Sequence, residues 1–235
     1  MPIDGWLDAL PGPETGGVDH DVTLFAGRGY PLLSQRTVRR QVTRLSAHLG
    51  AMDDGLRRAL IGYSLYTRQL DVVQGRATKH ICRDGCERPP LGCCNRSHNV
   101  VFSLSDIMMQ QPSGLALRMG DALARLQADE GAHHAKGAAM GERGCPYLTA
   151  TGCPLRLFKS PLCVHYLCGT VADALDVAHG DGAAPFVAGM RRAASRQIER
   201  STDFMEPGLI EAAVEMFGAD GGAGTGYGNA WQGHA

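Results

Sequence analysis

The chain has 235 residues, of which 44% are hydrophobic, and a formal net charge of −1. This length is enough for a substantial core, so the cysteines are not needed to staple a very small fold. The balanced charge provides no basic field that would recruit nucleic acid, and we expect no nucleic-acid partner.

Neither a secretory signal nor a membrane span is predicted. The opening residues 1–17 lack a basic start and an apolar run, and no segment reaches the roughly 18 apolar residues that a span requires. We therefore expect a cytoplasmic protein. In that reducing compartment, clustered cysteines favour metal binding or redox chemistry over structural disulfides.

The first third of the chain predicts an irregular arm followed by a helical hairpin. Residues 1–33 contain prolines and glycines without helical periodicity. Apolar residues then recur at helical spacing from Ser34 or Thr37 to a stop at Gly50. A second helix is expected from a cap at Asp53 or Asp54 to about Val73, with its end at Gly75, and the two helices should pack antiparallel. The apolar stripes of the two helices are formed by Val38, Val42, Leu45, Leu49, Leu56, Leu60, Tyr63 and Leu70.

The middle of the chain predicts a loop, a short β-prone run and a further helix. The loop is the glycine- and proline-rich segment CRDGCERPPLGCC at 82–94. The run at 100–102 precedes a possible helix cap at Ser103 or Ser105, and residues 114–128 form another amphipathic helix. The Glu-x-x-His at 130–133 has no second copy, so we interpret it as a solvated helix end.

The last third predicts a second irregular loop and three helices. Prolines in the segment 145–168 exclude a long regular element. Helices are expected at roughly 170–178, 184–202 and 207–217. The glycine-rich residues 218–235 are expected to form a flexible tail. The whole chain is thus predicted to be mainly α-helical, with a single helical domain at 34–217 whose core motif spans 80–168.

Eight cysteines occur in two groups of four, one in each irregular loop. Four thiolates satisfy tetrahedral zinc or a [4Fe–4S] cluster, so the pattern predicts a metal or iron–sulfur site built where the two loops converge. The adjacent pair and the total of eight thiols favour iron–sulfur over zinc. The expected ligands are Cys82, Cys86, Cys93, Cys94, Cys145, Cys153, Cys163 and Cys168.

Polar residues near the cysteines could support such a site. His98 and His165 lie in or next to the two loops, where each could replace a ligand, donate a hydrogen bond to a sulfur, or simply be packed. Basic residues could offset the negative charge of the thiolates or be solvated. They are Arg83, Arg88, Arg96 and Lys159.

The cysteine motifs also resemble those of a known family. CRDGCERPPLGCC followed by SLSDI, and then CPYL, GCPL and KSPLC, resembles the bacterial cysteine-cluster (C-x2-C-x2-CC type) family described as zinc- or iron-chelating domains. That family includes relatives of the flagellin lysine methylase. The opening spacings are wider here, Val164 stands where the family has arginine, and Cys168 is an added thiol. The resemblance implies metal chelation and allows protein modification.

Three functions are compatible with these observations. The favoured one is an electron-transfer or accessory oxidoreductase role based on an iron–sulfur cluster, with a protein redox partner. The alternatives are a structural zinc module for protein interaction and a cluster-dependent, methylase-like modifying enzyme.

Overall fold

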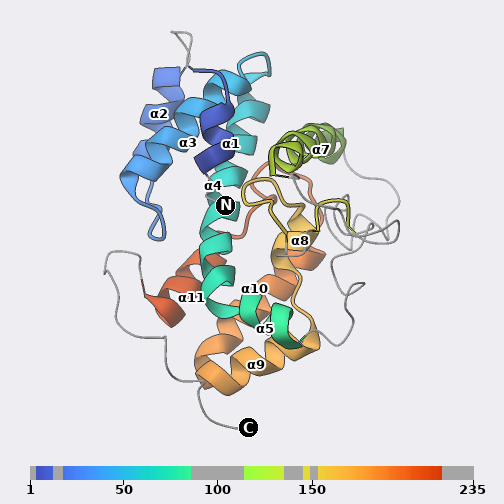
Figure 1. Cartoon of the computed structure of the whole chain (residues 1–235). Helices are drawn as coiled ribbons and strands as arrows, with labels where there is room; N and C mark the ends of the chain where they lie inside the picture. The colour runs from blue at the N-terminus through green and yellow to red at the C-terminus, as the bar shows by residue number, and fades with distance from the viewer. Residues whose placement is uncertain (1–3, 13–17, 86–113, 135–144, 149–152, 219–235) are drawn as a thin grey trace.

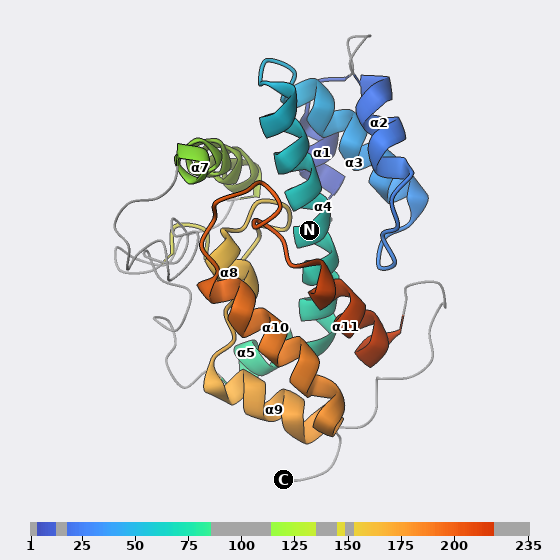
Figure 2. The same ribbon diagram turned by 180° about the vertical axis from the view of Figure 1, so that it is seen from behind.

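The computed structural model describes residues 4–12, 18–85, 114–134, 145–148 and 153–218. Helices account for 73% of these residues and no strand occurs among them, which confirms the mainly helical class. Figures 1 and 2 show the helices arranged around one long helix, α4 (Asp54–Ala77). The expected run at 100–102, the helix cap at 103 or 105 and nearly all of the tail, 219–235, lie outside the described residues.

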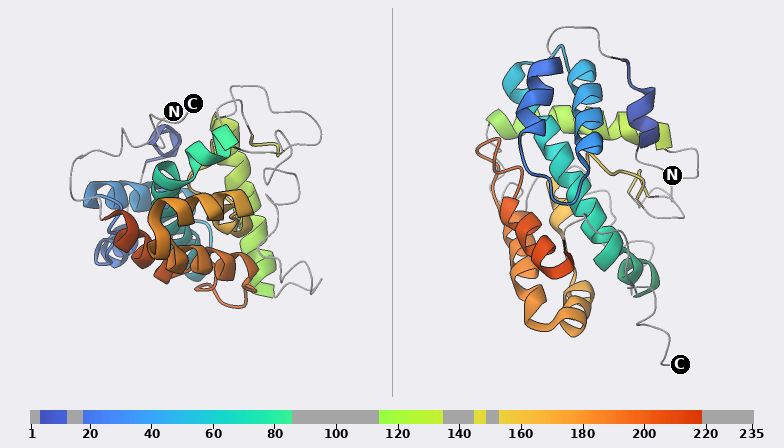
Figure 3. Two further views of the ribbon diagram at one scale, coloured as in Figure 1. Left: turned by 90° about the horizontal axis from the view of Figure 1, so that it is seen from below. Right: turned by 90° about the vertical axis from the view of Figure 1, so that its left-hand side faces the viewer.

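Helix α4 is the central element. Every residue from 60 to 71 is buried, which is more than three turns of helix. A helix buried over whole turns has to be covered on all sides, and neighbouring elements of this chain provide that cover. Figure 3 shows α7 (Gly114–His134) crossing α4 rather than running along it.

The N-terminal segment is helical, so the expected irregular arm at 1–33 is wrong for the described part of it. It forms α1 (Asp4–Ala9) and α2 (Val18–Ala26). Trp6, Leu7 and Phe25 are buried in the same hydrophobic cluster as the core of α4. These helices are too short for a repeating apolar stripe to be visible in the sequence, and burial of a few large side chains stabilises them instead.

A buried ion network fixes α2 to the next two helices. Asp21 is fully buried and its carboxylate accepts hydrogen bonds from Arg57 and Arg58, each at 2.8 Å, and from Ser46 at 3.0 Å. Burial acts to raise the pKa of Asp21, but these donors outweigh it and the pKa is lowered. Asp21 is therefore a charged anchor.

The expected helical hairpin is confirmed. Ser34 caps α3 (Gln35–His48) by accepting from the Thr37 backbone N–H at 3.1 Å. Asp53 caps α4 in the same way by accepting from Leu56 at 2.9 Å. The expected end at Gly75 is wrong, since α4 continues to Ala77. An exposed helical glycine costs only about 1 kcal/mol relative to alanine, and burial of the next turn offsets that cost.

Helix α7 is longer than predicted. Met119, Leu123 and Leu126 are buried as expected, but the helix runs beyond residue 128 to His134. Gly131 does not end it. That position lies against the Tyr147 ring, and a Cβ atom there would be 2.6 Å from Tyr147 Cδ1.

The C-terminal part forms a small helical layer beside the C-terminal half of α4 (Figure 1). Its α10 packs against α8 and α11, and α5 packs against α9 (Figure 2). The helix expected at 184–202 ends earlier, at Ser195, because Arg196 adopts an extended conformation. The elements are α5 (Lys79–Gly85), α8 (Pro161–His165), α9 (Gly169–His179), η2 (Gly180–Ala183), α10 (Ala184–Ser195) and α11 (Pro207–Phe217). Among the described helices, none combines the length and apolar character needed to cross a bilayer.

Two glycine substitutions test the packing of this layer. A Cβ at Gly189 would lie 2.5 Å from Cδ2 of the fully buried Leu209, whereas a Cβ at Gly75 would meet nothing within 4 Å. We expect Gly189→Ala to lower the free energy of unfolding by about 1–3 kcal/mol through overpacking. Gly75→Ala, the matched control, should raise it by about 0.5–1 kcal/mol. Chemical denaturation measures both, and equal effects would contradict the described α10–α11 contact.

Candidate metal centre

The second cysteine loop includes a buried segment without regular secondary structure. Residues 153–160 are not helical, yet most of them, and all of 157–162, are buried. Such a segment cannot satisfy its own backbone polar groups and needs partners on other elements. Side chains of α4 and α7 provide them, so this segment is held between the two helices (Figure 1).

Glu130 of α7 is one of these partners. Its carboxylate accepts three consecutive backbone N–H groups, from Arg156 at 2.6 Å, Leu157 at 3.2 Å and Phe158 at 3.1 Å. The side chain is 1% exposed. Burial raises the pKa of Glu130 to about 7, although the three donors act in the opposite direction. The interpretation of residues 130–133 as a solvated helix end is therefore wrong for Glu130.

A stripe of polar groups on α4 binds the other side of the segment. The Tyr63 hydroxyl donates to the Lys159 carbonyl oxygen at 2.5 Å, and Gln74 Nε2 donates to the Val164 carbonyl oxygen at 2.8 Å. Residues 63 and 74 are three turns apart, so they lie on one face of the helix. The apolar periodicity of α4 therefore coexists with a polar face that is equally buried.

His165 of α8 is bound by another residue of this stripe, Tyr66. The Tyr66 hydroxyl is 2.6 Å from its Nε2, and Nδ1 is 2.7 Å from the Pro161 carbonyl oxygen. Because a carbonyl oxygen can only accept, Nδ1 carries the proton and Nε2 accepts from Tyr66. Both ring nitrogens are used within the protein, so this geometry leaves neither for a metal or a sulfur. Burial lowers the pKa of His165 to about 4 and keeps the ring neutral.

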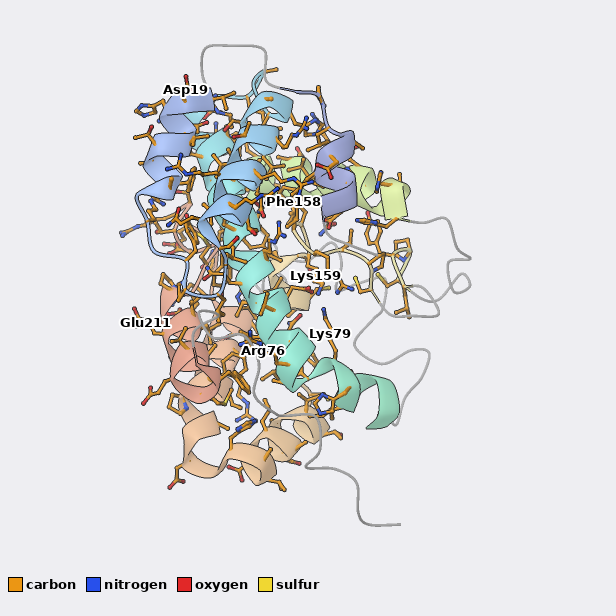
Figure 4. The ribbon with its side chains drawn as sticks, turned by 60° about the vertical axis from the view of Figure 1, so that its left-hand side comes forward. Asp19, Arg76, Lys79, Phe158, Lys159 and Glu211 are labelled. Carbon is orange, nitrogen blue, oxygen red and sulfur yellow. The ribbon has the colours of Figure 1, made fainter. Side chains whose placement is uncertain are left out.

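Three cations surround a single carboxylate oxygen beside the same segment. Asp71 Oδ1 lies 2.8 Å from Lys79 Nζ, 3.1 Å from Arg156 Nη1 and 3.0 Å from Lys159 Nζ. Figure 4 shows the two lysines near each other beside α4. Burial acts to raise the pKa of Asp71, but the cations outweigh it and lower the pKa to about 2. Lys159 is thus buried, so the alternative that it is solvated is wrong.

Cys153 of the second group lies in this anchored segment, and Cys163 follows it in α8. Cys145 is buried, while Cys153, Cys163 and Cys168 are half-buried. Burial raises the pKa of the Tyr147 phenol, and the Cys145 and Cys153 thiols raise it further. In a similar way the Cys163 thiol contributes to the raised pKa of Tyr63.

Of the first cysteine group, only Cys82 is described. It is exposed on α5, and α5 packs against α9, which begins directly after Cys168. Cys86, Cys93, Cys94 and His98 lie outside the described residues. Within the described ranges, no group of three or more His, Cys, Asp or Glu side chains is close enough to hold a metal ion.

Several of these groups have no motif in the sequence. Asp71, Gln74 and Glu130 look like surface residues of amphipathic helices. One signal could have identified the cation cluster: the chain has only three lysines among 23 basic residues, and two of them, Lys79 and Lys159, belong to it.

No protein-family model, no curated protein and no solved structure matches the chain.

Glu130 makes the stability depend on pH. Its folded pKa of about 7 lies above its ordinary value of 4.5, so the folded state binds the proton more tightly. The resulting stabilisation is fully present below pH 4.5 and is lost as the pH rises through 7, a change of about 3 kcal/mol. Glu130→Gln should remove this dependence, whereas Asp129→Asn, on the exposed neighbour, should keep it. Denaturation at pH 5 and pH 8 measures the difference, and parallel profiles for wild type and Glu130→Gln would contradict the assignment.

Tyr66→Phe tests the hydrogen bond to His165. The substitution leaves a buried Nε2 without its donor, which should lower the free energy of unfolding by about 1–3 kcal/mol at pH 8. His165 itself favours the neutral ring in the folded state, since its pKa is lowered from 6.5 to about 4. Its contribution is therefore lost as the pH falls through this range. Thermal unfolding at pH 8 checks the bond, and an unchanged melting temperature would count against it. The His165 contribution is measured at pH 5 and pH 8 in the Glu130→Gln background, where the opposing titration of Glu130 is absent.

Proposed function

We propose that the chain is a metal-binding protein whose cysteines ligate an iron–sulfur cluster, with an electron-transfer or accessory oxidoreductase role. The observation that carries this proposal is the sequence pattern of eight cysteines in two groups of four. A bound cluster would supply electron transfer at a site held by thiolates. The resemblance to the cysteine-cluster chelating family is consistent with this assignment.

The anchoring of the second loop supports the proposal. Residues 153–165 are held by hydrogen bonds to Glu130, Tyr63, Tyr66 and Gln74. Ligands that are already fixed by the protein lose little conformational freedom when a metal binds. The helices therefore act as a rigid scaffold for the thiols of this loop.

The position of α5 supports convergence of the two cysteine groups. Helix α5 carries Cys82 and leads into residues 86–94, which contain the rest of the first group. It packs against α9, whose N-cap is Cys168 of the second group. Cys82 and Cys168 are 86 residues apart in the chain, yet their adjoining helices are neighbours.

The chemistry of the donors suits the proposed cofactor. Thiolates next to lysine and arginine side chains are stabilised in the form that binds metal. The described cysteines do not form a complete ligand set by themselves, so the proposal requires some of Cys86, Cys93 and Cys94. A structural zinc site is the alternative, because zinc binds the same donors.

Metal and sulfide analysis distinguishes these assignments. Protein purified without oxygen should be brown, contain iron and acid-labile sulfide, and lose its visible absorption on reduction. A colourless protein with stoichiometric zinc would support the structural alternative instead. A protein that contains neither metal would overturn the proposal.

Cys82→Ser tests whether the first group contributes a ligand. Cys82 is exposed, so its replacement should not disturb the core, and a loss of metal would reflect the missing thiolate. His80→Ala, on an exposed position of the same helix, is the matched control and should retain the metal. We expect the metal content of Cys82→Ser to fall well below that of wild type while its far-UV circular dichroism is unchanged. Equal metal content in both variants would exclude Cys82 as a ligand.

A further inference from the structure

The cation cluster around Asp71 has more positive charge than its own carboxylate neutralises. Lys79, Arg156 and Lys159 all contact the same oxygen of Asp71. With all four groups ionised, the cluster has a formal excess of two positive charges. Like charges held close together repel each other, and the buried Lys159 also loses hydration, so a nearby anion would stabilise this arrangement.

The buried member of the cluster, Lys159, cannot turn its ammonium group into solvent. The Lys159 side chain is 8% exposed, its Nζ also donates to Gln74 Oε1 at 3.3 Å, and its backbone oxygen accepts from Tyr63. The side chains of Lys79 and Arg156 are 38% and 25% exposed, so the cluster opens toward solvent on one side. Three fixed cations therefore lie at the edge of the buried core.

The second cysteine loop supplies a candidate for the anion. Arg156 and Lys159 belong to the same extended segment as Cys153. Cys153 is three residues before Arg156 in the chain, and Arg156 Nη1 contacts Asp71 Oδ1 at 3.1 Å. Burial acts to lower the pKa of Lys159, but Asp71 and the Cys153 thiol outweigh it and the pKa is raised.

We propose that Asp71, Lys79, Arg156 and Lys159 form the counter-charge of the thiolate-ligated centre, with Cys153, three residues before Arg156, as the adjoining ligand. This inference rests on the proposed metal-binding function. Four thiolates around a divalent zinc ion, or around a cluster core of charge 2+, retain about two negative charges. The excess of the cation cluster matches that charge. Asp71 then has the role of holding three cations at one place rather than of neutralising them.

The first test uses the metal-loaded protein. Lys159→Met removes one positive charge with little change in side-chain volume, and Lys159→Arg keeps the charge. We expect Lys159→Met to transfer its metal to a chelator about tenfold faster than wild type, and Lys159→Arg to stay within about twofold of wild type. If the centre is an iron–sulfur cluster, Lys159→Met should also have a more negative reduction potential.

Arg118→Met is the matched charge control. Arg118 is an exposed residue of α7 that lies 3.8 Å from Asp53 at the start of α4. That end of the helix is about 27 Å from Asp71 at 1.5 Å per residue. Arg118→Met should therefore behave as wild type. If Lys159→Met does not fold, Lys79→Met at the more exposed position provides the same loss of charge.

The second test does not depend on metal. The metal-free, reduced protein is alkylated separately with iodoacetate, which is an anion, and with neutral iodoacetamide, and modification of Cys153 is followed by mass spectrometry. The ratio of the two rates reports the local potential, because the amount of thiolate cancels. Loss of one cation should lower this ratio about three- to fivefold in Lys159→Met. Lys159→Arg and Arg118→Met should retain the wild-type ratio.

The outcomes separate the two proposals. Wild-type protein without iron or zinc would overturn the proposed function and, with it, the counter-charge role. A metal-loaded protein in which Lys159→Met changes neither metal transfer nor the alkylation ratio would overturn the inference alone. Stabilisation of the metal-free wild type, but not of Lys159→Met, by inorganic phosphate would assign the cluster to a small oxyanion and would likewise overturn the inference.

Discussion

The structure depends on the hydrogen bonding of one extended segment between two helices. Residues 153–160 contain Pro154, are followed by Pro161 and are largely buried, so a continuous helix is disfavoured and their backbone cannot rely on water. Side chains of α4 and α7 supply donors and acceptors from both sides. This requirement explains why a helix as buried as α4 has a polar stripe, and why a carboxylate on α7 is buried. The buried polar side chains of α4 and α7 therefore need the segment as partner, just as the segment needs them.

This arrangement places two carboxyl groups beside a buried segment, where their surroundings shift their pKa values strongly. Asp71 and Glu130 lie on different helices and contact neighbouring parts of the same segment. Their pKa values are shifted in opposite directions, because burial outweighs the backbone N–H donors at Glu130, whereas three cations outweigh burial at Asp71. Two acids close to one loop therefore have different protonation at neutral pH. Cys153 lies in the same segment, three residues before Arg156, which contacts both acids.

The sequence predicted the fold well where a periodic pattern decides the structure. The capped hairpin of α3 and α4 and the position of α11 follow from apolar spacing and from the caps at Ser34 and Asp53. It failed at α1 and α2, where single buried side chains replace a pattern. It also failed for the polar contacts of the site, because Asp71 or Glu130 looks like any exposed helix residue until tertiary packing covers it. The cysteine pattern predicts the type of chemistry, whereas the partners that position the second loop come from segments up to 99 residues away.

This separation along the chain has a consequence for biosynthesis. Tyr63 and its partner, the carbonyl of residue 159, are 96 residues apart, and Gln74 and residue 164 are 90 apart. At about 5–20 residues per second, a ribosome needs roughly 5–20 s to add the segment that covers this face of α4. During that interval the nascent polypeptide exposes a long helix with an uncovered apolar and polar face. A holding chaperone that shields residues 60–74 for this time would prevent premature association between unfinished chains.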